Sequence, residues 1–390
     1  MSDAPRKLSH YFTHSKRKGR AGLPLVSVTM HDGLVRRDTL DRKTDSALLD
    51  EEHLLVEPGD IAYNMMRMWQ GALGLADEAA NVSPAYGVMR PKNTVDPRFA
   101  KHWFKSDRGL YMLWAYSYGL TEDRLRLYPN EFLRLPVAWP DKCEQTRLAD
   151  MLDEWDAAIA KAEKLAEESE RRFRYSLKFI FRNAQTTFEN WKVTEVTKIA
   201  EIVGGGTPAT NDLQFWDGDI PWCTPSDLSS LSGRFISKTE RCISPKGLKA
   251  SSAQLLPAGS VILCSRASVG ECAINTVPMA TNQGFQSLVP HDPRDLDFIY
   301  FMIRANQRQL LRISAGSTFL EFSRGELKKL KFPMPKPKER RRLGELFVNL
   351  DEQRAGAHRA AILLRQQKRG VMQRLFTDGF CNPDGLSSAA

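Results

Sequence analysis

The chain has 390 residues, of which 42% are hydrophobic and 26% are charged, and its formal net charge is +9. This length is too great for one ordinary domain and predicts two or three, with enough apolar material for more than one core. No apolar run approaches the ~20 residues that a membrane helix needs, and the first residues lack a secretory signal, so we expect a cytoplasmic protein. The excess of Lys and Arg favours an anionic partner, nucleic acid first.

The chain contains one internal repeat. A turn with a short apolar run at Leu54–Ile61 recurs at Leu255–Val261, and an Arg-x-x-x-Gly segment follows in each copy. Later positions keep an offset of 199 residues and then, in an ungapped block, of 195. The matched positions are Gly59 with Gly259, Arg67 with Arg266, Gly71 with Gly270, Tyr86 with Phe285, Pro91 with Pro290, Phe99 with Phe298, Glu131 with Glu326, Leu135 with Leu330, Pro140 with Pro335, Glu144 with Glu339, Leu148 with Leu343, Asp156 with Asp351 and Phe181 with Phe376. This ordered match predicts two copies of one structural unit.

Each copy consists of a turn-rich segment followed by a polar segment without proline. Pro140 and Pro335 stand at the entrances to the two polar segments, where a residue without an N–H donor fits the start of a helix. We therefore expect an α+β protein with a pseudo-two-fold repeat. Its expected parts, in chain order, are a first α/β domain (1–142), a central helix (143–185), a second α/β domain (186–337), a C-terminal helix (338–377) and a disordered tail (378–390).

Both polar segments carry a helical seam. Apolar and small residues recur at alternating steps of four and three, which is typical of a helix packed against another helix. Arg354 and Lys368 interrupt the second seam. The seam residues are Leu148, Leu152, Trp155 and Ile159 in the first helix and Leu343, Phe347, Leu350 and Leu364 in the second. We expect an antiparallel coiled coil that holds the two domains at a fixed separation; alternatively, each helix covers only the core of its own domain.

The sequence offers no recognisable catalytic centre. It contains no G-x-x-x-x-G-K-[ST] phosphate loop, and the glycine-rich Gly204–Pro208 lacks the lysine of such a loop. Ser83-Pro-Ala-Tyr86 only partly resembles the N-P-P-Y motif of adenine methyltransferases, so a turn is the simpler interpretation. The six cysteines include no C-x-x-C pair, and we expect reduced thiols and no metal site.

Basic clusters and directed polar side chains are the candidates for nucleic-acid contacts. Lys and Arg bind phosphates, whereas Arg reads guanine and Asn or Gln reads adenine in the major groove. The candidates in the first domain are Lys16, Arg17, Lys18, Arg20, Arg36, Arg37, Asn64, Arg67, Gln70, Arg124 and Arg126. Those in the second domain are Arg234, Lys238, Arg241, Arg266, Asn282 and Gln283. Arg67 and Arg266 occupy equivalent positions, where each either clamps a phosphate or braces a loop.

Several short motifs in both domains are similar to those of one known family. They are Gly59–Asn64, Met68–Gly71, Val82–Tyr86, Leu135–Pro140 and Glu144-Gln145 in the first copy, and Gly205–Pro208, Trp216-x-Gly218-x-Ile220-x-Trp222, Asp227 and Thr281–Gly284 in the second. In these motifs, and over nearly its whole length, the chain resembles the specificity subunit of type I restriction–modification systems. The second copy departs from the family pattern at Glu339-Arg340, where Glu-Gln is usual.

The resemblance implies a non-catalytic DNA-recognition subunit. Each of two target-recognition domains would read half of a bipartite target, and because the domains differ in sequence, the half-sites should differ too. The family also implies that the helices dock two methyltransferase subunits, which use S-adenosylmethionine for adenine methylation, and that motor-nuclease subunits join for cleavage in phage defence. This chain would then hold no cofactor of its own.

Two other functions stay open on the residues alone. An autonomous DNA-modifying enzyme would bind S-adenosylmethionine, or cleave DNA with a metal, by itself. A coiled-coil scaffold without DNA specificity would show no salt-dependent affinity for duplex DNA. DNA and cofactor binding by the purified chain therefore discriminate among the three.

Overall fold

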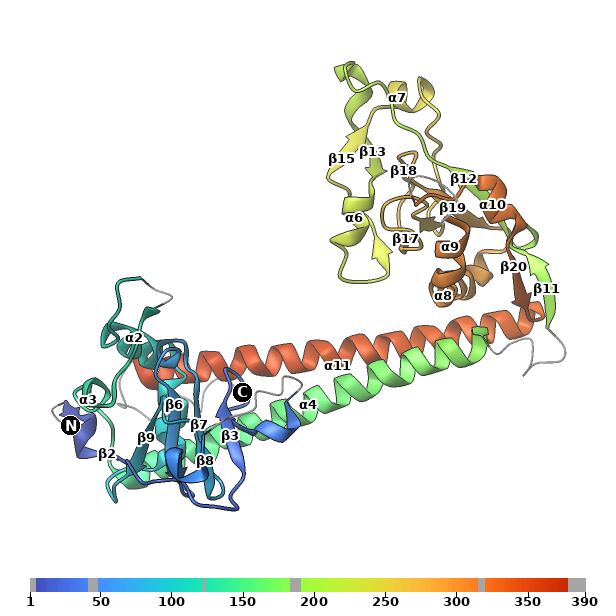
Figure 1. Cartoon of the computed structure of the whole chain (residues 1–390). Coiled ribbons are helices and arrows are strands. Elements are labelled where there is room, and N and C mark those ends of the chain that lie inside the picture. The colour runs from blue at the N-terminus through green and yellow to red at the C-terminus, as the bar shows by residue number, and fades with distance from the viewer. Residues whose placement is uncertain (1–4, 41–47, 122–123, 183–190, 315–319, 378–390) are drawn as a thin grey trace. The chain divides into compact units, whose positions relative to one another are not determined.

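The computed structural model describes residues 5–40, 48–121, 124–182, 191–314 and 320–377. The chain divides into two compact units, Met1–Glu163 with Ala360–Ala390, and Lys164–Arg359. Two long helices, α4 (Lys142–Arg182) and α11 (Pro337–Thr377), contribute a stretch to each unit (Figure 1). Within the described residues, no helix combines the length and the apolar character that crossing a membrane requires.

The first unit is built on two four-stranded sheets. One is antiparallel with the order β2-β9-β6-β7, and the other has the order β4-β3-β8-β5. Strand β1 pairs with β10, and helices α1 to α3 follow the sheets in the chain. The bounds are β1 (Arg6–Lys7), β2 (Phe12–His14), β3 (Leu25–Val28), β4 (Leu34–Arg36), β5 (Leu54–Val56), β6 (Ile61–Asn64), β7 (Leu73–Leu75), β8 (Ala80–Val82), β9 (Tyr86–Pro91), α1 (Pro97–Phe104), α2 (Asp107–Ala115), α3 (Pro129–Phe132) and β10 (Pro136–Val137).

Aromatic rings fill the core of the first unit. The ring of Phe104 lies 5.2 Å from that of Phe132 and 5.8 Å from that of Trp139, distances at which such rings attract one another. Helix α4 adds Leu148 to this core, and α11 adds Phe376. The long helices are therefore part of the hydrophobic core of this unit.

The second unit has the same kind of architecture. Its larger sheet has the order β12-β19-β16-β17-β14, its smaller sheet has the order β15-β13-β18, and β11 pairs with β20. The bounds are β11 (Lys192–Glu195), β12 (Ala200–Gly204), β13 (Trp216–Cys223), α6 (Pro225–Ser229), β14 (Phe235–Ile236), β15 (Arg241–Ile243), α7 (Pro245–Lys249), β16 (Val261–Leu263), β17 (Cys272–Asn275), β18 (Ala280–Thr281), β19 (Gln286–Pro290), α8 (Leu296–Ala305), α9 (Gln307–Ser314), α10 (Arg324–Lys329) and β20 (Lys331–Met334).

The internal repeat is visible in the strand order and in the backbone. The neighbours β9-β6-β7 of the first unit correspond to β19-β16-β17 of the second, and two helices follow each set. Gly59 and Gly259 adopt φ values of 90° and 80°, and Gly71 and Gly270 adopt 86° and 84°. Because L side chains rarely adopt such angles, the matched turns require glycine. The predicted α+β fold with a twofold internal repeat is confirmed.

The long helices pair antiparallel inside each unit. The cross-helix contacts are Lys368 with Asp156 and Arg365 with Glu163 in the first unit, and Arg354 with Glu170 and Phe347 with Phe181 in the second. Residue numbers rise along α4 while those of their partners fall along α11, as the heptad pattern predicted. The two cations that interrupt the seam therefore each face an acid of the other helix.

The expected domain boundaries are not tested by these observations and stay a prediction. Helix α4 ends at Arg182 and α11 ends at Thr377. The end of the expected central helix (183–185) and the expected tail (378–390) lie outside the described residues.

The first turn of each long helix is tied to the helix that follows the sheet. In the first unit, Gln145 is fully buried; its Oε1 accepts the backbone N–H of Asp96 at 3.0 Å, and its Nε2 donates to the carbonyl of Pro140 at 2.8 Å. In the second unit the equivalent residue is Arg340, whose Nη2 lies 2.5 Å from Oδ2 of Asp295. Where the first copy uses the side-chain hydrogen bonds of Gln145, the second copy therefore uses the ion pair between Arg340 and Asp295.

Candidate nucleic-acid interface

The motifs of the second unit meet at one place. The backbone N–H of Gly206 donates to the carbonyl of Thr281 at 2.9 Å, and Nε1 of Trp222 donates to the carbonyl of Gly206 at 2.9 Å. A Cβ atom on Gly205 would lie only 1.8 Å from the carbonyl oxygen of Asn282. The glycine-rich segment, the tryptophan strand and the Thr281–Gly284 turn therefore form one packed surface, and the close approach explains the glycine.

Three polar side chains occupy this surface. The hydroxyl of Thr207 donates to Oε1 of Gln283, whose side chain is exposed. Arg241 is exposed and lies with its guanidinium carbon 3.6 Å from the ring centroid of Trp216, a cation–π contact that holds the side chain in place. Fixed orientation is what base readout needs, because hydrogen bonds to base edges are directional.

Arg266 lies beside the same turn. The backbone N–H of Ser265 donates to the carbonyl of Gly284 at 2.8 Å, and a Cβ on Gly284 would lie 3.9 Å from Cβ of Arg266. The next residue, Ala267, has a φ of 65°, which costs roughly 1–2 kcal/mol for a residue with a Cβ. Non-glycine residues in this conformation concentrate at functional sites.

The structure thus brings together Arg241, Arg266, Asn282 and Gln283 of the candidates in the second unit. Of these four, Asn282 has a structural role: its Oδ1 accepts the backbone N–H of Gly284 at 2.9 Å and so stabilises the turn. Thr207 was missed as a site residue, although it stands inside the glycine-rich motif. Lys238 is exposed.

In the first unit, Arg67 and Gln70 lie at the turn that precedes β7. Both are exposed, and Nη1 of Arg67 donates to Oε1 of Gln70 at 3.4 Å. Asn64 accepts the backbone N–H of Met66 at 3.0 Å through its Oδ1, so its side chain caps the turn. Arg67 and Gln70 are therefore better placed than Asn64 to contact a ligand.

An aromatic and basic surface adjoins this turn. The backbone N–H of Leu127 donates to the carbonyl of Met65 at 2.9 Å, which joins the turn to the Arg126–Tyr118 bridge. Tyr118 is 60% exposed and lines a hollow of about 520 Å³ together with Lys16. Tyr128, which is 46% exposed, lines the same hollow, and exposed rings that gather at one place favour a contact surface. The exposed basic candidates of this unit are Lys16, Lys18, Arg20, Arg36, Arg67, Arg124 and Arg126.

Some basic candidates are engaged within the protein. Arg17 pairs with Glu57, and its Nη2 lies 2.5 Å from Oδ2 of Asp60. The hydrogen bond from Arg17 lowers the pKa of Glu57. Arg234 has a side chain only 10% exposed, with Nη1 3.3 Å from Oδ2 of Asp351. These contacts favour structural roles for Arg17 and Arg234.

Two further arginines of the first unit have polar partners. Nε of Arg37 donates to Oγ of Ser27 at 2.9 Å, and Nε of Arg36 lies 3.7 Å from Oδ1 of Asp38. The Arg36–Asp38 pair is largely exposed and contributes little stability.

The predicted seam residues divide between the units. Leu148 and Leu152 are buried in the first unit, and Phe347 and Leu350 are buried in the second. Ile159 is buried, whereas the other seam residues, Trp155, Leu343 and Leu364, are half-buried.

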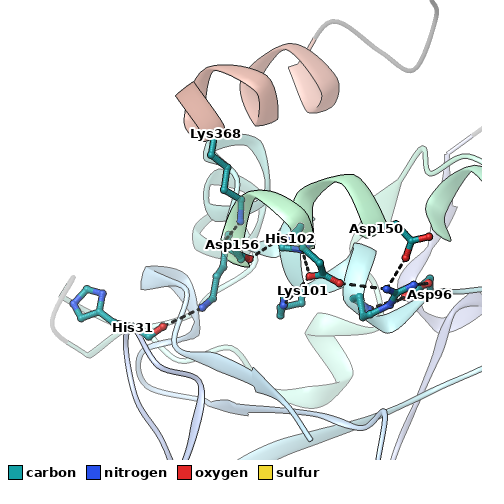
Figure 2. Close-up of polar contacts among 10 residues, drawn as sticks. His31, Asp96, Lys101, His102, Asp150, Asp156 and Lys368 are labelled. Carbon is teal, nitrogen blue, oxygen red and sulfur yellow. Dashed lines mark hydrogen bonds and ion pairs between the residues drawn. The ribbon is translucent and has the colours of Figure 1, made fainter. Parts of the chain in front are cut away.

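One cluster in the first unit has residues of the types that bind metals. Nε2 of His102 lies 2.8 Å from Oδ1 of Asp153, and a ligand atom of Asp156 lies within 4.8 Å of both (Figure 2). Lys101 and Lys368 already pair with these two carboxylates, at 3.4 and 2.5 Å. Burial, followed by the charge of Lys368, lowers the pKa of His102 to about 4. The cluster therefore links α1, α4 and α11 through ion pairs.

Comparison with known proteins agrees with this geometry. Residues 188–359, which contain the whole clustered surface of the second unit, match the type I restriction modification DNA specificity domain family. The chain is a relative of type I restriction specificity subunits. It is 34% identical over 183 residues to the type I restriction enzyme MjaIX specificity subunit of Methanocaldococcus jannaschii, covering 46% of this chain and 42% of that one. It is 28% identical over 232 residues to the EcoR124I/EcoR124II specificity subunit of Escherichia coli, covering 56% and 55%.

The chain thus spans about half the length, or less, of these curated specificity subunits. The similarity in fold covers more of the chain than the similarity in sequence. The solved structure of the type I restriction-modification S subunit from M. genitalium covers 97% of this chain and 98% of its own, with a TM-score of 0.59 and 14% identity. The fold of a specificity subunit therefore extends through both units.

Proposed function

We propose that this chain is the non-catalytic DNA-recognition subunit of a type I restriction–modification complex. The observation that carries the proposal is the packing of three motifs against one another, with Arg241 on the tryptophan strand and with Arg266 and Gln283 at the Thr281–Gly284 turn. Arg and Gln are the side chains that read guanine and adenine in the major groove. The surface therefore supports direct readout of one half-site by the second unit.

The first unit is proposed to read the other half-site. It repeats the fold but presents Arg67, Gln70 and the tyrosine-lined hollow in place of the second unit's motifs. Because different side chains prefer different bases, the two half-sites should differ, and the target should be bipartite and asymmetric. The exposed lysines and arginines of both units would bind phosphates and fix the register on the duplex.

The paired helices are proposed to set the spacer between the half-sites and to dock two methyltransferase subunits. S-adenosylmethionine and the methylation of adenine belong to those subunits in this proposal, and motor-nuclease subunits would supply cleavage. The chain itself would hold no cofactor and act in the cytoplasm.

DNA binding tests the proposal. The chain is mixed with its methyltransferase partner and a fluorescent duplex library, and the bound sequences are recovered and their affinity measured by anisotropy. We expect selection of one bipartite sequence and an affinity that falls steeply with salt. Arg266→Gln and Gln283→Ala should each cost about 1–3 kcal/mol against the native target and relax the preference at one position of one half-site.

The matched control is Arg312→Gln. Arg312 is exposed in the second unit but lines a separate hollow with Phe181 and Lys331. It should leave both affinity and preference unchanged. The proposal fails if duplexes of all sequences bind equally, or if the isolated chain binds S-adenosylmethionine, which would favour an autonomous enzyme. Absence of DNA binding with the partner present would favour a scaffold.

A second experiment tests the spacer. Four residues, about one helical turn or 6 Å, are inserted into both α4 and α11. The target spacer should lengthen by about 2 base pairs, since each base pair rises 3.4 Å, while both half-sites stay the same. A change in the half-sites themselves would show that the helices take part in base readout.

A further inference from the structure

Each unit contains a cleft, and these two clefts occupy equivalent places in the repeat. The first cleft, of about 860 Å³, is lined by Leu34, Leu73, Lys105, Asp156, Ile159 and Met372. The second cleft, of about 520 Å³, is lined by Phe173, Leu228, Cys272, Arg304, Asp351 and Arg354. Lys105 and Arg304 are related by the repeat offset of 199 residues, and Asp156 and Asp351 by the offset of 195. The two clefts therefore hold a cation and an acid at matching positions.

The two acids at matching positions, Asp156 and Asp351, already have charged partners. Oδ1 of Asp156 lies 2.5 Å from Nζ of Lys368. Figure 2 shows the two side chains pointing toward each other. Asp351 lies 2.6 Å from Nη2 of Arg354 and 3.3 Å from Nη1 of Arg234. These carboxylates are thus neutralised by the long helices and by a loop of the domain.

The hydrogen-bond partners of the matching cations are neutral, although Asp156 attracts Lys105 and Asp351 attracts Arg304 at longer range. Nζ of Lys105 donates to the carbonyl of His31 at 3.5 Å, and Nη1 of Arg304 donates to the hydroxyl of Tyr300 at 3.2 Å. Among the described residues, no carboxylate lies within 4.0 Å of either cation. Burial, with the charge of Lys101 next in size, lowers the pKa of Lys105. The pKa of Arg304 is instead raised despite its burial, by Tyr300 and, less strongly, by Asp351. A cation without a carboxylate in direct contact keeps room for a charge-assisted hydrogen bond to an anionic group from outside.

The rest of the lining decides which anion fits. Apolar side chains reach into both clefts, and carboxylates stand among the lining residues, including Asp107 and Glu163 in the first cleft and Glu271 in the second. Further lysines and arginines line both clefts, so charges of both signs stand among the apolar side chains. Apolar side chains mixed with charges of both signs are closer to a protein contact than to a groove for DNA phosphates, which is dominated by positive charge. A peptide segment with one carboxylate among apolar side chains satisfies both features.

We propose that the two clefts are docking sites for the same acidic–apolar segment, presented once by each of two copies of one partner chain. Equivalent clefts in a repeated protein call for equivalent ligands. This inference rests on the proposed function, in which the methyltransferase subunit is the partner that binds twice. Lys105 pairs with the carboxylate of one copy, and Arg304 pairs with that of the other.

Charge reversal in the full chain, without DNA, tests the docking. Native mass spectrometry counts the methyltransferase copies bound, and calorimetry measures their affinity. The unchanged chain should bind two copies. Lys105→Glu or Arg304→Glu should each weaken one copy by about 30-fold or more, leaving a complex with one copy, and the double variant should bind neither.

The controls separate charge from folding. Lys105→Arg and Arg304→Lys keep the charge and should still bind two copies. Lys18→Glu and Lys249→Glu reverse exposed cations of the two units outside the clefts, and should also bind two copies. Equal melting temperatures of variants and parent confirm that the chain is folded.

The outcomes are distinct. If the unchanged chain binds two copies and the reversed variants bind two copies with equal affinity, the docking inference is wrong while the proposed function stands. If those variants keep both copies but lose affinity for DNA, the clefts bind phosphate, and the docking inference is again wrong. If the unchanged chain binds no methyltransferase, the proposed function itself fails.

Discussion

The ion pair between Arg340 and Asp295 offers the sharpest stability test. Asp295 is 2% exposed and Arg340 is 14% exposed, and two nitrogens of the guanidinium, Nε at 3.1 Å and Nη2 at 2.5 Å, donate to one carboxylate oxygen. Asp295→Ala leaves the guanidinium almost buried without its counter-charge. Breaking a buried pair costs ~3–5 kcal/mol, and the remaining exposure of Arg340 lets water offset part of this, so we expect about 3 kcal/mol.

Hydrogen exchange measured by mass spectrometry in a urea series resolves this loss, because peptides of α8 report the second unit separately. With a urea dependence of about 2–3 kcal/mol per molar, the midpoint should fall by about 1–1.5 M. The double variant Asp295→Ala with Arg340→Met should recover to within about 1 kcal/mol of the parent, since an apolar pair needs no counter-charge. Peptides of the first unit should not change.

The control is Arg294→Ala, which leaves Asp292 paired with Arg341 at 2.8 Å and removes the exposed pair of Asp292 with Arg294. The side chains of this pair are 31% and 68% exposed, so the loss should stay below about 1 kcal/mol. Equal losses from Asp295→Ala and Arg294→Ala would refute the argument that burial makes the Arg340 pair costly. So would a double variant no more stable than Asp295→Ala.

Three further outcomes are expected. Gly205→Ala should destabilise the second unit by about 1–3 kcal/mol in a thermal melt, because its Cβ would overlap a backbone oxygen, whereas Gly233→Ala, with open space around it, should change little. The pKa of His102 is lowered to about 4, so unfolding takes up a proton between pH 6.5 and 4. The free energy of unfolding of the first unit should therefore fall by on the order of 3 kcal/mol as the pH drops through this window. In urea melts at several pH values, His102→Gln should flatten that dependence. Phe347→Ala, at a fully buried ring, should cost about 3–5 kcal/mol by calorimetry, and Leu346→Ala, at a side chain 43% exposed, below about 1.

The repeat and the helices could be predicted from sequence because their causes are local or periodic. The positive φ at Gly59 and Gly259 requires a residue without a Cβ, which leaves a visible mark in both copies. A buried helical seam must place apolar residues at steps of three and four, and Leu152 and Phe347 follow from that rule. Composition and motif spacing likewise indicated a protein that reads nucleic acid.

The candidate site could be predicted only in part. Basic residues were found as a set, but the sequence could not separate Arg17 and Arg234, which pair with carboxylates of their own unit, from Arg241, which lies exposed on a tryptophan ring. One partner of Arg17 is Asp60, 43 residues away in the chain. Pairing over such distances depends on how the sheets are assembled, which no local pattern records.

The sequence by itself therefore determined the two related units, their paired helices and the motifs of a specificity subunit, since turns, heptads and short motifs are set by neighbouring residues. The tertiary structure decided which of these residues meet. Only packing brings Gly206, Trp222 and Thr281 into one surface, pairs Arg340 with Asp295, and leaves Lys105 hydrogen-bonded to a backbone carbonyl. Contacts between segments far apart in the chain depend on close packing of the whole unit, and this packing decides which cations meet a carboxylate and which meet only neutral groups at short range.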